Sequence, residues 1–354
     1  MEDIFLYTFL GFLTALLLTY FIIPKIILFS KDKRLYIKPN ERAAHEKNTP
    51  FFGGIAIFGG IGFSFLFWGI GMENVNNIGF VLSSLIIIFI VGLIDDLLSL
   101  SPFGKMIGQL LAILVLVFFA GFEIDNMHGV FGIFDISTYV SIPFTIFVVV
   151  VITNSYNLID GIDGLAAGIG IIASIFFGFF AFLNANYLMV ILAFSLTGSL
   201  IAYLIFNFYP AKILMGDTGS LVVGFIFAIL SIDLIRSGVI FQDILYINKG
   251  PLIAISLLSV PLFDSLRVFL FRVYSGKYPL YADRNHIHHR LLDLGFSHRR
   301  IAIILYILSL VTIIFSLLLI HININYSIAI MAISVYLLML APIYILRRFN
   351  RKNE

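Results

Sequence analysis

The sequence predicts an all-α polytopic membrane protein with about eleven transmembrane helices, and three observations carry this prediction. First, 60% of the 354 residues are apolar, only 12% are charged and the mean hydropathy is +1.06, which excludes an ordinary soluble domain. Second, about eleven stretches have the roughly 20 apolar residues that a spanning helix needs. Third, the positive charges fall in every second connection between these stretches.

The helices are assigned in order from the apolar runs between polar breaks. The first run follows Glu2 and Asp3 and not a basic region, so we expect a retained helix and not a cleaved signal peptide. No repeat or low-complexity linker divides the chain, which predicts one integral-membrane domain over residues 1–354. The expected spans are 4 to 23, 51 to 70, 78 to 94, 105 to 122, 139 to 157, 164 to 183, 187 to 206, 218 to 235, 251 to 271, 301 to 320 and 326 to 346.

The orientation follows from the cations, because Lys and Arg beside spans are retained on the cytoplasmic side. Of the 22 Lys and Arg residues, all but Arg236 and Lys249 lie in the connections after odd-numbered helices or in the C-terminal tail. This predicts an N-terminus outside, a C-terminus in the cytoplasm and a basic cytoplasmic loop over residues 272–300.

Composition also narrows the chemistry. A net charge of +2 gives no electrostatic reason to expect a nucleic-acid partner. The absence of cysteine excludes disulfides, thiolate metal sites and thiol nucleophiles. Any chemistry must therefore use carboxylates, amides, histidines, cations and hydroxyls.

Polar residues of these kinds gather in four runs on the predicted cytoplasmic side. An ionisable residue in the end of an apolar helix costs a few kcal/mol unless it faces a partner or a cavity. Several of them on one face therefore predict a shared site. The outward connections carry Glu73, Glu123, Asp125, Asp135 and Asp243 without comparable clustering.

The first run is the adjacent pair Asp95 and Asp96, which ends the third expected helix. Adjacent carboxylates repel, so either a cation neutralises them or one becomes a poor acid and a candidate base. Lys105, at the start of the next helix, is placed to neutralise the pair or to bind a phosphate. The alternatives are a polar helix end in the headgroup region and an interfacial lysine.

The second run places Asn154, Asn157, Asp160 and Asp163 at steps of three, where a helix turns into a tight loop that contains glycine. Their oxygens are hard ligands of the kind that Mg²⁺ accepts while it keeps waters and binds substrate phosphates. The alternative is a capped turn in which these side chains serve backbone groups.

The third run has Asp217 between Gly216 and Gly219 at the start of a helix, where backbone donors and a positive helix end can face an anion. The alternative is a plain N-cap by Asp217 or Thr218. No Gly-Lys-Ser or Gly-Lys-Thr follows, so the run is not a P-loop.

The fourth run has three histidines in four residues, which can ligate a transition metal, transfer protons or donate to phosphate. Arginines on both sides favour phosphate over zinc. The alternative is a solvated charged loop. The histidines are His286, His288 and His289, and the arginines are Arg272, Arg284 and Arg290.

In this order and on these helices, the four runs resemble those of the polyprenyl-phosphate N-acetylhexosamine-1-phosphate transferases, glycosyltransferase family 4. The resemblance covers the chain from about Lys38 to Gly295 and includes the eleven-helix layout. The run His286-Ile287-His288-His289 is similar to the WecA and TagO branch and not to the MraY branch. The segment Pro39-Asn40-Glu41-Arg42 with His45 is similar to the first cytoplasmic loop of the family.

The resemblance implies an enzyme that transfers N-acetylhexosamine 1-phosphate, with GlcNAc-1-phosphate as the first expectation, from a UDP-sugar to undecaprenyl phosphate. UMP is released, and the product initiates synthesis of a cell-envelope glycan such as a cell-wall polymer or lipopolysaccharide. The resemblance also implies Mg²⁺ as the cofactor, with Mn²⁺ as a substitute. It further implies contacts with membrane lipids, a multi-pass location in the inner (cytoplasmic) membrane, and an assembly that is compatible with a homodimer.

Site roles follow from the resemblance by position. Asn157 and Asp217 match metal ligands. The catalytic positions are matched by Asp95, Asp96, Asp160 and Asp163, with Asp95 or Asp96 as the base or orienting group for the lipid phosphate. The substrate-binding positions are matched by Lys105, Asn154, Arg272, His286, His288 and His289. The resemblance therefore makes residues 272–300 a cytoplasmic substrate-binding loop.

Some positions depart from the family pattern. Ser99 stands where some members carry a third carboxylate, and Ile37, Lys38 and Phe51 differ in the first loop. Two alternatives stay open. One is the same reaction with another UDP-sugar, such as a muramoyl-pentapeptide or a deoxy-amino sugar. The other is a lipid or solute transporter, which would place polar residues through the midplane of the bilayer.

Overall fold

The computed structural model describes residues 2–33, 35–36, 49–71, 75–241, 245–247, 249–276 and 285–353. The first-loop segment over residues 39–45 and Arg284 lie outside these ranges. The elements are α1 (Glu2–Lys33), α2 (Gly53–Gly69), α3 (Val75–Leu98), α4 (Pro102–Phe118), β1 (Asn126–Val130), β2 (Ile133–Asp135), α5 (Thr138–Leu158), α6 (Leu165–Leu183), α7 (Tyr187–Asn207), α8 (Gly216–Ser237), β3 (Val239–Phe241), β4 (Leu245–Ile247), α9 (Gly250–Leu257), α10 (Ser259–Tyr274), α11 (Ile287–Asp293), α12 (His298–Leu318) and α13 (Ile324–Asn353).

The described helices confirm the predicted class of an all-α polytopic membrane protein. Among them, eight are long and apolar enough to cross a membrane, and α9 and α10 together form a further, bent candidate. Helices α2 and α4 are apolar but shorter. Each expected span except that over residues 251 to 271 falls on one helix, while the number that cross and the end that faces the cytoplasm stay predictions.

The stretch expected as one helix over residues 251 to 271 is in fact two helices. Helices α9 and α10 meet at Leu258 with an angle of 81° between them. Pro261 explains the position of the break, because proline has no N–H to donate and is tolerated in the first turn of a helix but not in its interior. Helix α10 therefore begins just before Pro261, and it carries the buried residues Asp264 and Arg272.

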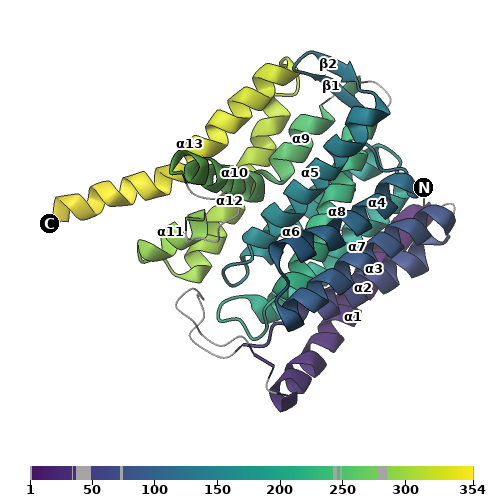
Figure 1. The fold of residues 1–354 in the computed structure, drawn as a ribbon, viewed down its shortest axis with the longest axis horizontal. Coiled ribbons are helices and arrows are strands. Elements are labelled where there is room, and N and C mark those ends of the chain that lie inside the picture. Colours follow the sequence, from purple (N-terminus) through teal and green to yellow (C-terminus); the bar gives the residue numbers. More distant parts are fainter. Residues whose placement is uncertain are drawn as a thin grey trace.

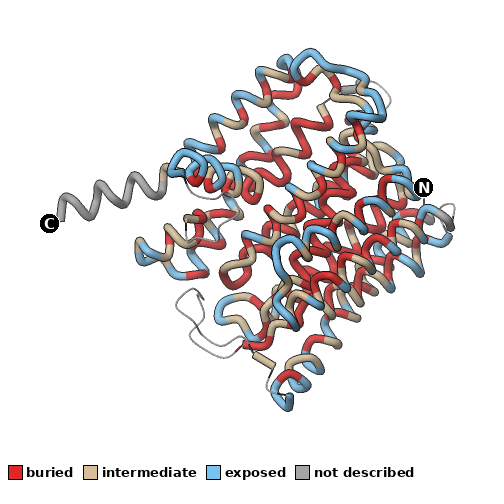
Figure 2. The backbone as a smooth tube through the Cα atoms, viewed as in Figure 1, coloured by how far each residue is buried: buried red, intermediate tan, exposed pale blue. Residues whose placement is uncertain are grey.

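Helix α8 forms much of the buried centre of the bundle (Figure 1), and Figure 2 shows the buried residues concentrated there. Every residue from Thr218 to Ile232 is buried. Glycines let α2 and α3 approach its first turn. A Cβ on Gly54 would lie 2.2 Å from Gly219 N, and one on Gly92 would lie 2.6 Å from Thr218 Cα. These close approaches therefore bring the first turn of α2 and the end of α3 that carries Asp95 and Asp96 directly onto the start of α8.

The two ends of the bundle differ in chemistry. At one end β1 and β2 pair in a hairpin (Figure 1), and the contacts between the connections there include bonds from side chains to backbone carbonyls. Arg236 donates to Gly121 O at 2.8 Å, and Asn325 Nδ2 donates to Gly129 O at 3.0 Å. Asp95, Asp96 and Asp217 lie together at the opposite end, where α3 ends and α8 begins, and Asp160 lies there in the turn after α5.

Candidate active site

Asp96 holds the start of α8. Its carboxylate accepts hydrogen bonds from the Asp217 N–H (2.8 Å), the Thr218 N–H (2.9 Å) and the Thr218 hydroxyl (2.5 Å). Gly216 has φ +73°, and a Cβ on it would lie 2.6 Å from Asp96 Oδ2, so this turn requires glycine. The side chain that satisfies the first donors of α8 therefore comes from α3, and not from Asp217 or Thr218 themselves.

Lys105 joins the first and third runs. Its Nζ lies 2.9 Å from Asp95 Oδ2 and 2.9 Å from Asp217 Oδ1. The other oxygen of Asp95 accepts the Leu100 N–H at 2.8 Å, which fixes the carboxylate at the end of α3. The adjacent carboxylates thus have separate tasks, because Asp95 pairs with the lysine while Asp96 holds α8.

Asn157 brings the second run to the same point. Its Nδ2 donates to Asp217 Oδ1 at 2.5 Å and to Ser220 Oγ at 2.7 Å. Ser220 in turn donates to Gly216 O at 2.9 Å, so the amide is held from α8 as well as from α5. Asn157 and Asp217, expected to share a role, are in direct contact.

Asn154 is one helical turn away and has a different environment. Its Oδ1 accepts from Gln109 Nε2 at 3.1 Å, and its Nδ2 donates to Gln109 Oε1 at 2.9 Å and to Val150 O at 2.8 Å. This reciprocal amide pair ties α4 to α5. The structure therefore places Asn154 behind the site, as a support for α5.

A pocket of about 210 Å³ lies beside Asn157. Asp160 lines it from the turn after α5, where desolvation raises the pKa of its carboxyl well above the ordinary range and nearby carboxylates, Asp217 first, raise it further. Cationic and imidazole groups line the other side, which makes the pocket suited to an anion. The lining residues are Asn157, Leu158, Asp160, Gly161, Arg272, His286, His288 and His289.

The histidines in this pocket are not equivalent. His286 Nδ1 lies 2.8 Å from Asp264 Oδ2. His288 is 1% exposed and packs against Gly161, where a Cβ would lie 2.3 Å from its Nε2. Burial, and then the neighbouring His289, lowers the pKa of His288 to about 3, so its ring is neutral. Burial of His286 and His288 does not fit the alternative of a solvated loop.

Asp163 lies outside this pocket. It is 4% exposed, its Oδ2 accepts the Ala211 N–H at 2.9 Å, and its Oδ1 lies 3.7 Å from His298 Nδ1. These contacts hold the turn after α5 against the loop before α8 and against α12. The structure therefore separates Asp163 from the other carboxylates of the four runs.

Sequence reasoning gave no role to several side chains that hold the site. Gln109 and Ser220 orient the two asparagines of α5, and neither residue type stands out in an apolar helix. Asp264 and Arg267 are ionisable residues in the first half of α10. The sequence places Asp264 among the polar residues expected on the cytoplasmic side, but it indicates no role for it.

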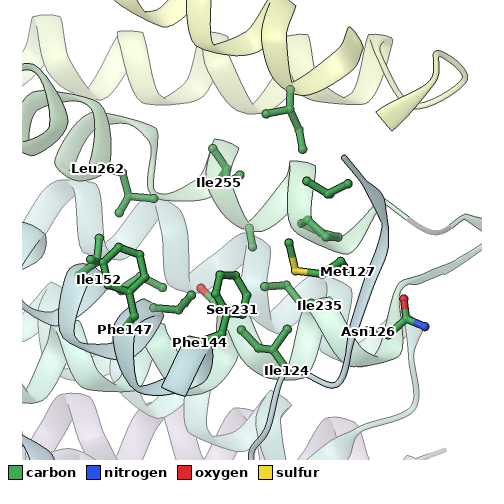
Figure 3. Close-up of a pocket in the computed structure, with 16 residues that line it drawn as sticks. Ile124, Asn126, Met127, Phe144, Phe147, Ile152, Ser231, Ile235, Ile255 and Leu262 are labelled. Carbon is green, nitrogen blue, oxygen red and sulfur yellow. The ribbon is translucent and has the colours of Figure 1, made fainter. Parts of the chain in front are cut away.

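An apolar cavity of about 330 Å³ lies between α5, α8, α9 and α10, with β1 and α13 at one side (Figure 3). Figure 3 shows Phe147, Ile152 and Leu262 toward one side of the cavity and Met127 toward the other. Asn126 and Ser231 are the polar residues in its lining. Phe147 is 62% exposed, so the cavity reaches the apolar surface of the bundle.

Comparison with known proteins gives matches to one family of membrane-bound transferases. The profile of glycosyl transferase family 4 matches residues 77–235. A probable undecaprenyl-phosphate N-acetylglucosaminyl 1-phosphate transferase of Bacillus subtilis is 34% identical over 83% of this chain and 80% of its own length. A decaprenyl-phosphate N-acetylglucosaminephosphotransferase of Mycobacterium tuberculosis is 32% identical over 83% and 78%. An undecaprenyl-phosphate alpha-N-acetylglucosaminyl 1-phosphate transferase of Escherichia coli is 26% identical over 80% and 77%.

Proposed function

Because the chain belongs to glycosyl transferase family 4, in the branch of the WecA-like and TagO-like sugar-phosphate transferases, we propose that it transfers GlcNAc 1-phosphate from UDP-GlcNAc to undecaprenyl phosphate. One observation carries the proposal. Lys105, Asn157 and Asp217 form one hydrogen-bonded group beside a pocket lined by arginine and histidine. Phosphoryl transfer between anions requires this combination of alignment and charge neutralisation.

The reaction balances without an added oxidant or base. An oxygen of the acceptor phosphate forms a bond to the β-phosphorus of the UDP-sugar, and the bond from that phosphorus to the bridging oxygen breaks with its electron pair leaving on UMP. A lipid phosphate is already ionised near neutral pH. We therefore assign Asp95 to positioning Lys105 for the acceptor phosphate, and Asp96 to holding α8, in place of proton abstraction.

The donor set fits Mg²⁺. In the described part of the chain no three acidic or histidine side chains surround one point, so the protein would supply few ligands and leave the others to water and substrate. Mg²⁺ is commonly held this way, by one or two carboxylates plus substrate phosphates. Lys105 Nζ, 2.9 Å from both Asp95 and Asp217, marks a position where a cation is accepted. Asp217 and Asn157 would hold the ion, which would neutralise charge on the diphosphate.

The anion pocket supports a site for the donor diphosphate and sugar. Arg272 is 7% exposed, and a guanidinium presents a rigid set of donors that matches phosphate oxygens. His286 and His289 add further donors. Asp160, protonated to higher pH than a free aspartate, can donate to a sugar or phosphate oxygen without adding negative charge.

The apolar cavity supports a site for the acceptor chain. Helix α5 contributes Phe147, Val151 and Ile152 to the cavity and, further along, Asn157 to the polar site. Ile152 and Asn157 are five residues apart, so the cavity begins about 8 Å along the helix from the metal-ligand candidates. An isoprenoid chain in the cavity would therefore place its phosphate near Lys105.

The same geometry supports a location for the protein. The chain is a multi-pass membrane protein. We assign it to the cytoplasmic membrane with the N-terminus outside and the C-terminus inside, because UDP-sugars are made in the cytosol and the basic connections lie at the end with the site. The product would initiate a cell-envelope glycan. A homodimer is compatible with this function but is not required by it.

The test uses purified protein with Mg²⁺, undecaprenyl phosphate and a panel of UDP-sugars, and it measures release of UMP. We expect release with UDP-GlcNAc, and loss of release in Asp217→Ala. Release with a muramoyl-pentapeptide or deoxy-amino sugar donor alone would keep the mechanism and change the substrate. If folded protein releases no UMP with any donor, a transporter would be favoured instead. The position of the polar runs at one end of the bundle, and not through its middle, argues against that alternative.

A further inference from the structure

Asp264 is a fully buried carboxylate that binds the segment beginning at Asn285. Its Oδ1 accepts from Arg267 Nη2 at 2.7 Å and from the Ile287 N–H at 2.9 Å, and its Oδ2 lies 2.8 Å from His286 Nδ1. Arg267 Nη2 also donates to Asn285 O at 2.6 Å. A buried charge is tolerated when it is paired and hydrogen-bonded in this way. The ion pair between Asp264 and Arg267 on α10 thus binds three consecutive residues, Asn285 to Ile287, which lead into α11.

The bond between Asp264 and His286 determines which ring nitrogen is free. An ionised carboxylate has no proton and can only accept, so the hydrogen between the two groups sits on His286 Nδ1. His286 lines the anion pocket and Asp264 does not. The ring therefore has its Nδ1 toward α10, which leaves Nε2 as the nitrogen available to the pocket.

The other buried histidine lacks this arrangement. His288 Nδ1 is buried with no hydrogen-bond partner among the described residues, and its Nε2 is against Gly161. The rings of His286 and His288 lie nearly parallel, with 5.8 Å between their centroids and 13° between their planes. His288 thus packs beside His286, while a carboxylate orients His286.

We infer that Asp264 is a positioning residue for the proposed transfer reaction, which fixes His286 in the tautomer that turns Nε2 to the phosphate of the donor. The identity of the phosphate as that of the donor rests on the proposed function, whereas the tautomer of His286 does not depend on it. The competing account is that Asp264 only fastens α11 to α10. The two accounts differ in what an isosteric change at Asp264 does.

Asp264→Asn is the direct test. If its amide oxygen stays with Arg267 and Ile287, its NH₂ group faces His286, so Nδ1 must accept and the ring proton moves to Nε2. In ¹⁵N-histidine-labelled protein without substrate, with the His286 signals identified by their loss in His286→Gln, we expect a protonated Nδ1 in the wild type and an unprotonated Nδ1 in the variant. We also expect kcat for UMP release to fall about 10–100-fold, the usual effect of removing the partner that orients a functional histidine, with a smaller change in KM.

Arg267→Lys is the matched control. This substitution disturbs the hydrogen bond to the Asn285 carbonyl but leaves the Asp264 carboxylate next to His286 Nδ1. We expect a lower Tm, an unchanged tautomer and a much smaller fall in kcat than in Asp264→Asn. A protonated Nδ1 in Asp264→Asn, or equal falls in kcat for the two variants, would overturn the inference and leave the fastening role.

A second pair of variants keeps the test decisive if Asp264→Asn does not fold. His286→Asn places an amide near Nδ1 and keeps the donor to Asp264, whereas His286→Gln places it near Nε2 and keeps a group at the pocket. We expect His286→Asn to be the more stable variant and His286→Gln the more active one, and the reverse order would contradict the inference. If the wild type turns over no donor, the proposed function fails, while a tautomer of His286 that is the same in the wild type and in Asp264→Asn would separately show that Asp264 does not fix the ring.

Discussion

The ammonium of Lys105 lies 2.9 Å from the carboxylate of Asp217, the same oxygen that accepts from Asn157. If Asp217 holds Mg²⁺ as proposed, the lysine and the metal ion would compete for one ligand, since like charges repel strongly at such distances. The lysine side chain is 18% exposed and so is not fixed by burial alone. It would then release Asp217 and follow a phosphate when the metal and substrates bind.

Lys105→Met tests this competition. We expect Mg²⁺ to raise the Tm of the substrate-free variant at an approximately tenfold lower concentration than it does in the wild type, because the competing charge is gone. We expect kcat to fall at least about 100-fold, because a charged group at the acceptor phosphate is lost. Lys212→Met, at an exposed lysine of the loop before α8, is the control and should change neither quantity. An unchanged Mg²⁺ midpoint in Lys105→Met would refute competition.

Asp96 is expected to matter for stability through its bonds to the first turn of α8. Asp96→Ala leaves two N–H groups and one hydroxyl without their acceptor, which should lower the free energy of unfolding by about 2 kcal/mol and the Tm by several degrees. Asp96→Asn keeps an acceptor oxygen and should lose less. Thermal unfolding of the purified variants decides the point, and equal Tm values for Asp96→Ala and the wild type would contradict it.

Asp160 and Asp163 are three residues apart but should respond differently. Asp160→Ala removes the proposed hydrogen-bond donor from the anion pocket, and we expect kcat to fall by about 100-fold. Asp163→Asn changes a buried contact to Ala211 and His298, so we expect a lower Tm with kcat in the folded fraction within about threefold of the wild type. UMP release normalised to folded protein separates the two, and an equal loss of kcat would show that Asp163 also acts in the reaction.

The raised pKa of Asp160 predicts a pH dependence of stability. The folded protein holds a proton on Asp160 at pH values above the ordinary aspartate pKa, where the unfolded chain has released it. Since the folded state binds more protons in this window, its stability falls as pH rises through it. Asp160→Asn cannot titrate, so the Tm of the variant relative to the wild type should be higher at about pH 8 than at about pH 5. Parallel Tm curves would contradict the raised pKa.

Much of the fold was predictable from sequence because a bilayer imposes simple rules. Lipid offers no hydrogen bonds to the backbone, so apolar runs of sufficient length must be helices. The expected spans accordingly match the described helices. The break at Leu258 was missed because the run continues in hydropathy across it, and only Pro261 marked the change of direction.

The sequence predicted which residues form the site better than it predicted what each of them does. Asp95, Asp96, Asn157 and Asp217 were expected together and lie together. The resemblance alone could not separate Asp160 from Asp163, because their difference arises from contacts with Ala211 and His298 in other elements. Asp264 was left without a role for a similar reason, since its partner His286 is 22 residues away and their pairing depends on how α10 meets α11.

The proposed reaction transfers a sugar together with its phosphate. It is tested with UDP-GlcNAc labelled with ³²P at the β-phosphate, undecaprenyl phosphate and Mg²⁺, by following the label into the lipid and aqueous phases. We expect the label to move into the lipid product, unlabelled UMP to appear in equal amount, and both to be lost in Asp217→Ala. Label that stays in the aqueous phase as UDP, while GlcNAc alone reaches the lipid, would contradict it.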